Sequence, residues 1–127
     1  ALAMLPAPAM AEGLLLQPVI PVEFKIAENI DARCRTLVMT PAAKAEVEAM
    51  KARYGAEVNR LVAQRDMKTV QDLSDKVREA MVADTPVIKA FEKKHGVQLG
   101  REPSSLCKAG EAEIKSGTAI GRMLKRK

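Results

Sequence analysis

Two cysteines, Cys34 and Cys107, are the residues of this 127-residue chain with the most evident chemistry. Their separation is far too long for a Cys-x-x-Cys redox motif, and no set of cysteines and histidines has the spacing of a zinc site. Each cysteine lies on or beside the apolar stripe of a predicted helix, so both thiols point toward the core. This predicts one disulfide between them, and the alternative is two buried free thiols in a reducing compartment.

The one histidine, His95, could in principle act as a base or as a metal ligand. It lies in "EKKHG", where a helix is expected to end, and a cation there interacts favourably with the helix dipole. No Ser-His-Asp or Cys-His arrangement can be built around it. The sequence also has no glycine-rich phosphate loop and no haem-attachment motif. We therefore predict no catalytic residue, no metal site, no cofactor and no enzymatic activity.

The remaining candidates for chemistry are carboxylates and methionines. Most acids alternate with lysine and arginine, as on a solvated helix surface. Glu57 and Glu113 lie nearest to inward-facing stripes, and two acids alone do not define a site. Met50, Met81 and Met123 lie on or near apolar faces, where methionine fills a core more often than it binds haem.

The most distinctive pattern lies in the last predicted helix, residues 104–125, which carries three glycines on one face and four basic residues on the opposite face. Glycine costs helix stability, so this face indicates either a closely packed neighbouring helix or a groove for a partner protein. The basic face indicates a partner contact or a solvated stripe. Nucleic acid is disfavoured because the chain has one tyrosine, two phenylalanines and no tryptophan for stacking. The candidate partner-contact residues are Gly110, Gly117, Gly121, Lys108, Lys115, Arg122 and Arg126.

The elements that position these residues are predicted to be helices. Good helix formers dominate from residue 41 onward, and aromatic residues are scarce, which disfavours a sheet. Thr40-Pro41 and Thr85-Pro86 each resemble an N-cap followed by proline at the first helical position. The sequence therefore predicts an all-α protein, an antiparallel bundle of four to five helices with an extended N-terminal arm. The expected helical segments are 26–38, 41–66, 68–83, 86–95 and 104–125.

Three of these segments show a clear apolar stripe. The stripe of 26–38 consists of Ile26, Ile30, Cys34 and Leu37. The stripe of 41–66 consists of Val47, Met50, Tyr54, Val58, Leu61 and Val62. The stripe of 68–83 consists of Val70, Leu73, Val77, Ala80 and Met81, and Asp66 or Thr69 is expected to cap the start of that helix.

The opening stretch "ALAMLPAPAMAEG" bears on the compartment. Ala9-Met10-Ala11 fits the small-x-small rule for signal peptidase cleavage, and prolines lie just upstream. We interpret residues 1–11 as the remnant of a signal peptide, 12–25 as an extended arm and 26–127 as a single helical domain. The alternatives are a flexible Ala/Pro arm and the mature start of an imported organellar protein. No apolar run is long enough to span a membrane.

Taken together, a small helical chain with one disulfide behind an export signal is similar in class to small periplasmic helical proteins such as acid-stress chaperones, although no motif matches a family. The chain has a net charge of +5, concentrated toward its C-terminus. We expect a periplasmic or secreted protein that acts by binding another protein, as a chaperone, inhibitor, immunity or assembly factor. The alternative is a small structural subunit of an organellar or cytoplasmic complex, anchored by the arm and the basic last helix.

Overall fold

The computed structural model describes residues 17–101 and 103–127, with the main chain alone for Pro103 and Ser104. Within this part the prediction of an all-helical protein is confirmed, because five helices account for most residues and the strands form one short pair. The helices are α2 (Val22–Arg33), α3 (Pro41–Ala63), α4 (Met67–His95), α5 (Pro103–Ser116) and α6 (Ala119–Arg122), and the strands are β1 (Leu37–Met39) and β2 (Leu124–Arg126).

The chain forms two compact units within what the sequence presents as one domain. The described residues of unit 1 are 17–19 and 49–83, so this unit consists mainly of the later part of α3 and the earlier part of α4. Unit 2 contains residues 20–48 and 84–127. The proposed signal-peptide remnant, residues 1–11, lies outside the described residues.

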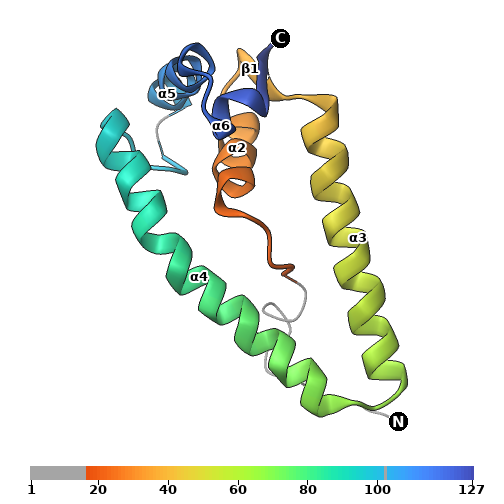
Figure 1. Cartoon of the computed structure of the whole chain (residues 1–127). Coiled ribbons are helices and arrows are strands. Elements are labelled where there is room, and N and C mark those ends of the chain that lie inside the picture. The colour runs from red at the N-terminus through yellow and green to blue at the C-terminus, as the bar shows by residue number, and fades with distance from the viewer. Residues whose placement is uncertain (1–16, 102) are drawn as a thin grey trace. The chain divides into compact units, whose positions relative to one another are not determined.

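Unit 2 has its core where α2 meets α5, α6 and the strand pair (Figure 1). Ile26, Ala27 and Ile30 present one stripe of α2 to this core and are at most 1% exposed. Burying such side chains stabilises a fold by about 1.5–3 kcal/mol each. Further buried side chains complete the core: Phe24, Cys34, Leu37, Met39, Val47, Phe91, Val97, Leu106, Ala109, Ile120 and Leu124.

The first helix begins earlier and ends earlier than predicted. Pro21 is its N-cap residue, a position where the missing N–H of proline costs nothing, so residues 22–25 of the expected arm form its first turn. Residues 12–16 of that arm lie outside the described residues. Cys34 is extended and ends the helix, which corrects the predicted span of 26–38.

Residues 37–39 form strand β1 instead of a helical end. Strand β1 pairs in antiparallel fashion with β2, with Leu37 opposite Arg126 and Met39 opposite Leu124. The Asp31 carboxylate accepts a hydrogen bond from the Met39 amide of β1 at 2.8 Å. The sequence gives no sign of this pairing, because a three-residue strand is too short to show an alternating pattern.

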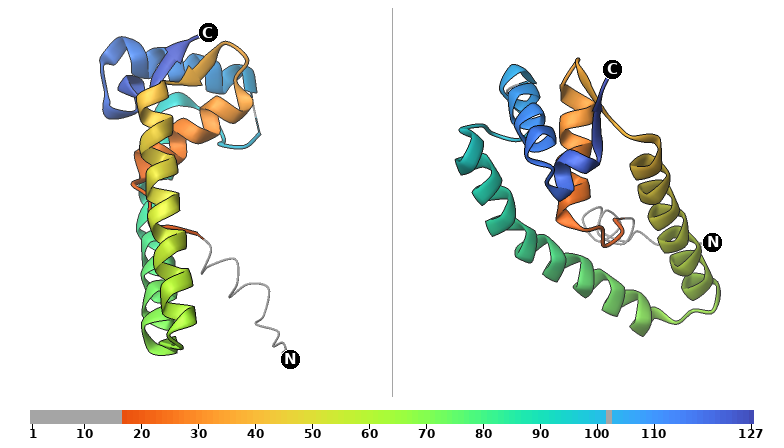
Figure 2. Two further views of the ribbon diagram at one scale, coloured as in Figure 1. Left: turned by 90° about the vertical axis from the view of Figure 1, so that its right-hand side faces the viewer. Right: turned by 45° about the horizontal axis from the view of Figure 1, so that its top comes forward.

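Helix α4 is one continuous helix, whereas the sequence predicted a break at Thr85-Pro86 (Figure 2). A proline inside a helix removes one hydrogen bond and crowds the preceding turn. Strong helix formers on both sides, in residues 79–83 and 89–94, sustain the helix through Pro86.

The capping predicted at Thr40, before α3, is confirmed, because its hydroxyl accepts a hydrogen bond from the Ala43 amide at 3.2 Å.

The last predicted helix is interrupted at Gly117, so the expected span of 104–125 is wrong. Gly117 has a φ of +65°, a conformation that favours glycine, and it ends α5. The Gly117 and Thr118 amides donate to the Ile114 and Glu113 carbonyls, which closes the helix end. The Thr118 hydroxyl then caps α6 by accepting a hydrogen bond from the Gly121 amide at 3.1 Å.

We predict that Gly121→Ala destabilises the protein by about 2–3 kcal/mol. Gly121 is buried, and a β-carbon there would overlap the main-chain carbonyl of Glu113, which cannot rotate away. Denaturant unfolding measures the effect. Gly55→Ala is the matched control, because no atom lies within 4 Å of a β-carbon at Gly55 and alanine favours the helix. Equal stability of the Gly121→Ala variant and the wild type would contradict the prediction.

Unit 1 contains two helical segments joined by a tight turn. Val58, Leu61, Val70 and Val77 are buried in it, as the apolar stripes predict. Val62 and Met81 were expected on the same stripes, but they are 51% and 44% exposed.

The turn between these segments explains where α4 begins. Arg65 adopts the left-handed conformation, with a φ of 57°, and so reverses the chain. Asp66 then acts as N-cap, because its carboxylate accepts hydrogen bonds from the Thr69 amide at 3.2 Å and from the Thr69 hydroxyl at 2.8 Å. Asp66 was one of the two caps that the sequence predicted for this helix.

Candidate functional site

Two hollows on unit 1 share two of their lining residues, Pro18 and the half-buried Tyr54. Their volumes are about 390 and 410 Å³. We call the two together the Tyr54 groove. The first hollow is also lined by Gln17, Lys51, Gly55, Val58 and Asn59, and the second by Val19, Met50, Arg53, Leu73 and Lys76.

The groove exists because α3 has a glycine where a side chain would fill the space. Gly55 lies inside the helix, where glycine costs about 1 kcal/mol relative to alanine. The sequence suggests a bend or a close helix contact as the reason, but α3 continues through Gly55 and, in the part of the chain that the structure describes, no atom approaches its β-carbon position within 4 Å. A mid-helix glycine beside the only tyrosine was the available sequence signal for this groove.

The charge on the groove has one sign. Among the described residues its lining includes Lys51, Arg53 and Lys76, all exposed, and no carboxylate. Three other hollows described on the protein each include at least one Asp or Glu: one has Glu28, Asp31 and Glu48, one has Asp75 and Glu79, and one has Glu46. The charged side chains that the structure describes in the lining of the Tyr54 groove are thus all basic.

We predict that the Tyr54 phenol titrates above its ordinary pKa of 10.0, because burial disfavours the phenolate and raises the pKa. Absorbance at 295 nm measures this directly, since the chain has a single tyrosine. Because the pKa is raised, the protonated Tyr54 phenol stabilises the folded state. This contribution is complete below pH 10.0 and is lost as the pH rises through the folded-state pKa. Titration in denaturant is the control and should return the ordinary value. A native midpoint at or below 10.0 would contradict the prediction.

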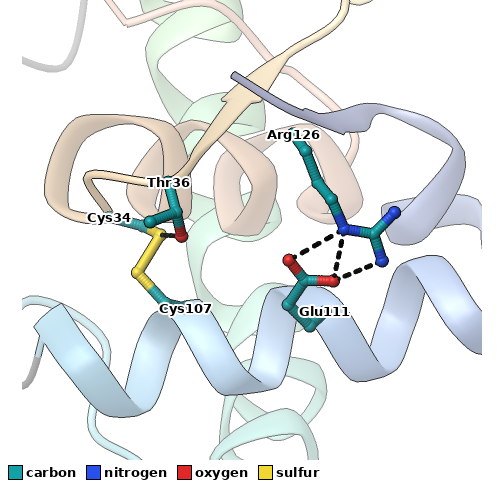
Figure 3. The surroundings of a disulfide bond; sticks show 5 residues. All are labelled: Cys34, Thr36, Cys107, Glu111 and Arg126. Carbon is teal, nitrogen blue, oxygen red and sulfur yellow. Dashed lines mark hydrogen bonds and ion pairs between the residues drawn. A yellow bond between two sulfur atoms is a disulfide. The ribbon is translucent and has the colours of Figure 1, made fainter.

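The disulfide between Cys34 and Cys107 joins the end of α2 to α5 within unit 2, as the sequence predicts (Figure 3). The two Cα atoms lie 5.2 Å apart, and the bond closes a loop across a sequence separation of 73 residues. The Thr36 hydroxyl lies 3.3 Å from the Cys34 sulfur. With both sulfurs oxidised, neither cysteine is a nucleophile or a metal ligand.

His95 and Glu113 form a buried hydrogen-bonded pair in unit 2, with the His95 Nε2 atom 2.6 Å from the Glu113 carboxylate. Their side chains are 9% and 4% exposed. Glu113 also accepts hydrogen bonds from the Lys94 ammonium at 2.8 Å and from the Thr118 hydroxyl at 2.6 Å. We call these four residues the Glu113 cluster. It joins the end of α4 to α5 and to the start of α6, so His95 has a structural partner that the sequence did not reveal.

Electrostatics favour the ionised form of Glu113. Burial by itself raises the pKa of this carboxyl, but the hydrogen bonds from Lys94, Thr118 and His95 outweigh burial and hold the pKa below its ordinary value. The ionised carboxylate on α5 thus accepts hydrogen bonds from the last turn of α4 and from Thr118 before α6.

The structure separates the glycines that the sequence placed on one helical face. Gly110 is buried in α5, with Leu37 and Ile30 beside it, and Gly121 is buried in α6, whereas Gly117 is exposed at the helix end. Close packing inside unit 2 thus accounts for Gly110 and Gly121.

The four basic candidates likewise do not form one helical stripe. Lys108 and Lys115 are exposed on α5, Arg122 is exposed on α6 and Arg126 lies on β2. Arg126 holds Glu111 of α5 through two hydrogen bonds from its Nε atom, at 3.0 and 3.1 Å, and a third from Nη2 (Figure 3). The pair raises the pKa of the Arg126 guanidinium above its ordinary value, through the hydrogen bond and then the charge of Glu111.

Likeness to known proteins and clusters of metal-binding side chains give no further candidate site in the described residues. No family model, curated protein or solved structure matches this chain. Among residues 17–101 and 103–127, no three or more His, Cys, Asp and Glu side chains gather as a metal site would require. In the same residues, no helix combines the length and apolar character needed to cross a membrane.

Proposed function

We propose that this chain is a non-enzymatic binding protein that acts by holding another protein in its Tyr54 groove. The observation that carries the proposal is the groove itself. It is an open apolar hollow beside a mid-helix glycine, and among the described residues no atom packs within 4 Å of the position that a β-carbon would take there. Concave apolar surfaces with a few polar groups at the edge are where proteins bind partners.

The state of the reactive side chains supports a binding role over an enzymatic one. Both cysteines are joined in the disulfide, and the single histidine is paired with Glu113 below the surface. The residues with the greatest catalytic potential are thus already committed to structural contacts. We infer that chaperone, inhibitor, immunity or assembly roles suit the chain better than a reaction does.

We further propose that the protein works in an oxidising compartment, as a periplasmic or secreted protein. Disulfides persist outside the reducing cytosol, and Ala9-Met10-Ala11 fits a signal peptidase site in the part of the chain outside the described residues. The intact mass of the natural protein, measured with and without reductant and alkylation, tests this. Thiols that alkylate without reduction would contradict it.

Site-specific photo-crosslinking tests the binding role. A photoreactive amino acid replaces Asn59, which lines the groove, in cells that make the protein, and mass spectrometry identifies what it captures. Ala56 is the matched control position, because it is exposed on α3 but lines neither hollow. A discrete adduct from position 59 that is absent from position 56 is expected. The same products from both positions, or none from either, would contradict a groove that binds protein.

A further inference from the structure

We propose that the partner of the Tyr54 groove is an acidic amphipathic segment of another protein, which places an apolar side chain over Gly55 and its carboxylates beside the groove's cations. The inference rests on the proposed binding function and adds the chemistry of the partner. It comes from three properties of unit 1: the apolar floor, the missing side chain at position 55, and the sign of the charges around them.

The floor selects an apolar group. Tyr54, Val58, Met50, Leu73 and Pro18 contribute most of the non-polar lining of the two hollows. Transfer of apolar surface from water onto such a floor is favourable by about 25 cal/mol for each Å² that is covered. A partner without an apolar side chain would leave this surface wet and would gain nothing from it.

Gly55 determines where the apolar side chain goes. No atom of the described residues lies within 4 Å of its β-carbon position, and on the helical surface of α3 Gly55 lies between Lys51 and Val58, which both line the same hollow. Absence of a side chain lets a partner approach the helix backbone closely, which is how small residues act at tightly packed helix contacts. An aliphatic side chain of a partner therefore fits there.

The charges determine the sign of the partner. Lys51 lines one hollow, and Arg53 and Lys76 line the other, with no carboxylate among the described residues of either lining. A segment that carries glutamate or aspartate next to its apolar residue meets complementary charges in both hollows. A basic segment meets like charges, which disfavour the wrong partner.

Two synthetic peptides test the proposal. Both are 20-residue helices with the same leucine stripe, and the remaining positions carry glutamate in one peptide and lysine in the other. Binding to the full chain is followed by the fluorescence of Tyr54, since the chain has one tyrosine and no tryptophan. We expect the acidic peptide to bind about tenfold more tightly than the basic peptide at low salt.

Two substitutions with matched controls locate the site. Gly55→Leu fills the first hollow and is compared with Ala56→Leu on the same helix. We expect only Gly55→Leu to weaken binding of the acidic peptide, by about tenfold.

The second substitution tests the charge. Lys76→Glu is compared with Lys68→Glu, which changes the net charge equally but lies outside both hollows. We expect about threefold weaker binding for the former alone.

The outcomes separate this inference from the proposed function. Equal binding of the two peptides, stronger binding of the basic peptide, or no binding of either would overturn the partner chemistry. The crosslinking at position 59 would still decide whether the groove binds protein. Binding that Gly55→Leu does not weaken would place the site elsewhere.

Two other occupants would also overturn the inference. A dimer of the free chain that Gly55→Leu abolishes in sedimentation would assign the groove to a second copy. The other occupant is the chain's own Leu14, Leu15 and Leu16. If they fill the groove, replacing them by serine should make the acidic peptide bind about tenfold more tightly. Unchanged binding in that variant, with a monomeric free chain, supports the external acidic partner.

Discussion

Reduction of the Cys34–Cys107 disulfide is expected to lower the free energy of unfolding by about 4 kcal/mol. The bond closes a loop over a sequence separation of 73 residues, so its loss restores many conformations to the unfolded chain. Cys34 is 3% exposed and contacts the core at the end of α2. Denaturant unfolding with and without a reductant measures the difference.

The Cys34→Ser, Cys107→Ser double variant is the control for this measurement. It should be as unstable as the reduced wild type, and reductant should not change it further. Unit 2 contains both cysteines, so α2, α5 and the strand pair should lose protection from hydrogen exchange first. If the reduced wild type unfolds at the same denaturant concentration as the oxidised protein, the disulfide does not stabilise the fold as described.

Glu113→Ala should destabilise the protein by about 2–4 kcal/mol, because a buried hydrogen-bond donor left without an acceptor costs about 1–3 kcal/mol and the change affects two of them. The change leaves the His95 imidazole and the Thr118 hydroxyl without the acceptor that they share. Glu113→Gln should cost less, because an amide oxygen can still accept hydrogen bonds. Equilibrium unfolding at neutral pH measures both variants.

The same carboxylate makes stability depend on pH. The folded-state pKa of Glu113 is below the ordinary value of 4.5, so its contribution is complete above pH 4.5 and is lost as the pH falls through the folded-state pKa. The difference in unfolding free energy between the wild type and Glu113→Gln should therefore shrink below pH 4.5. A difference that stays constant down to acidic pH would show that the ionised carboxylate is not what holds α4 to α5.

The helical class, the disulfide and most of the buried side chains could be predicted from the sequence, because they follow from local patterns. Ile26, Ile30, Cys34 and Leu37 were expected on one apolar stripe, and all four are buried. The predicted helix that carries them was partly wrong, because helix α2 ends at Cys34 and Leu37 belongs to a strand. The prediction that a side chain is buried can thus be correct even where the predicted helix boundary is wrong.

What escaped prediction depends on residues far apart in the chain. The partner of β1 lies at the other end of the sequence, and the Glu113 cluster combines the last turn of α4 with α5 and Thr118. No sequence window contains these pairs, so periodicity cannot reveal them. Gly117 was misassigned because a glycine inside a helical pattern and a glycine that ends a helix have the same sequence signature.

The disulfide has a consequence for how this chain responds to proteolysis. Residues 34 and 107 are covalently joined, and residues 49–83 of unit 1 lie in the stretch of chain between them. A protease that cuts the turn at Gln64 and Arg65, where both residues are exposed, would produce two fragments but would not release either of them. The nicked molecule would keep its mass on a non-reducing gel, and separation of the fragments would require a reductant.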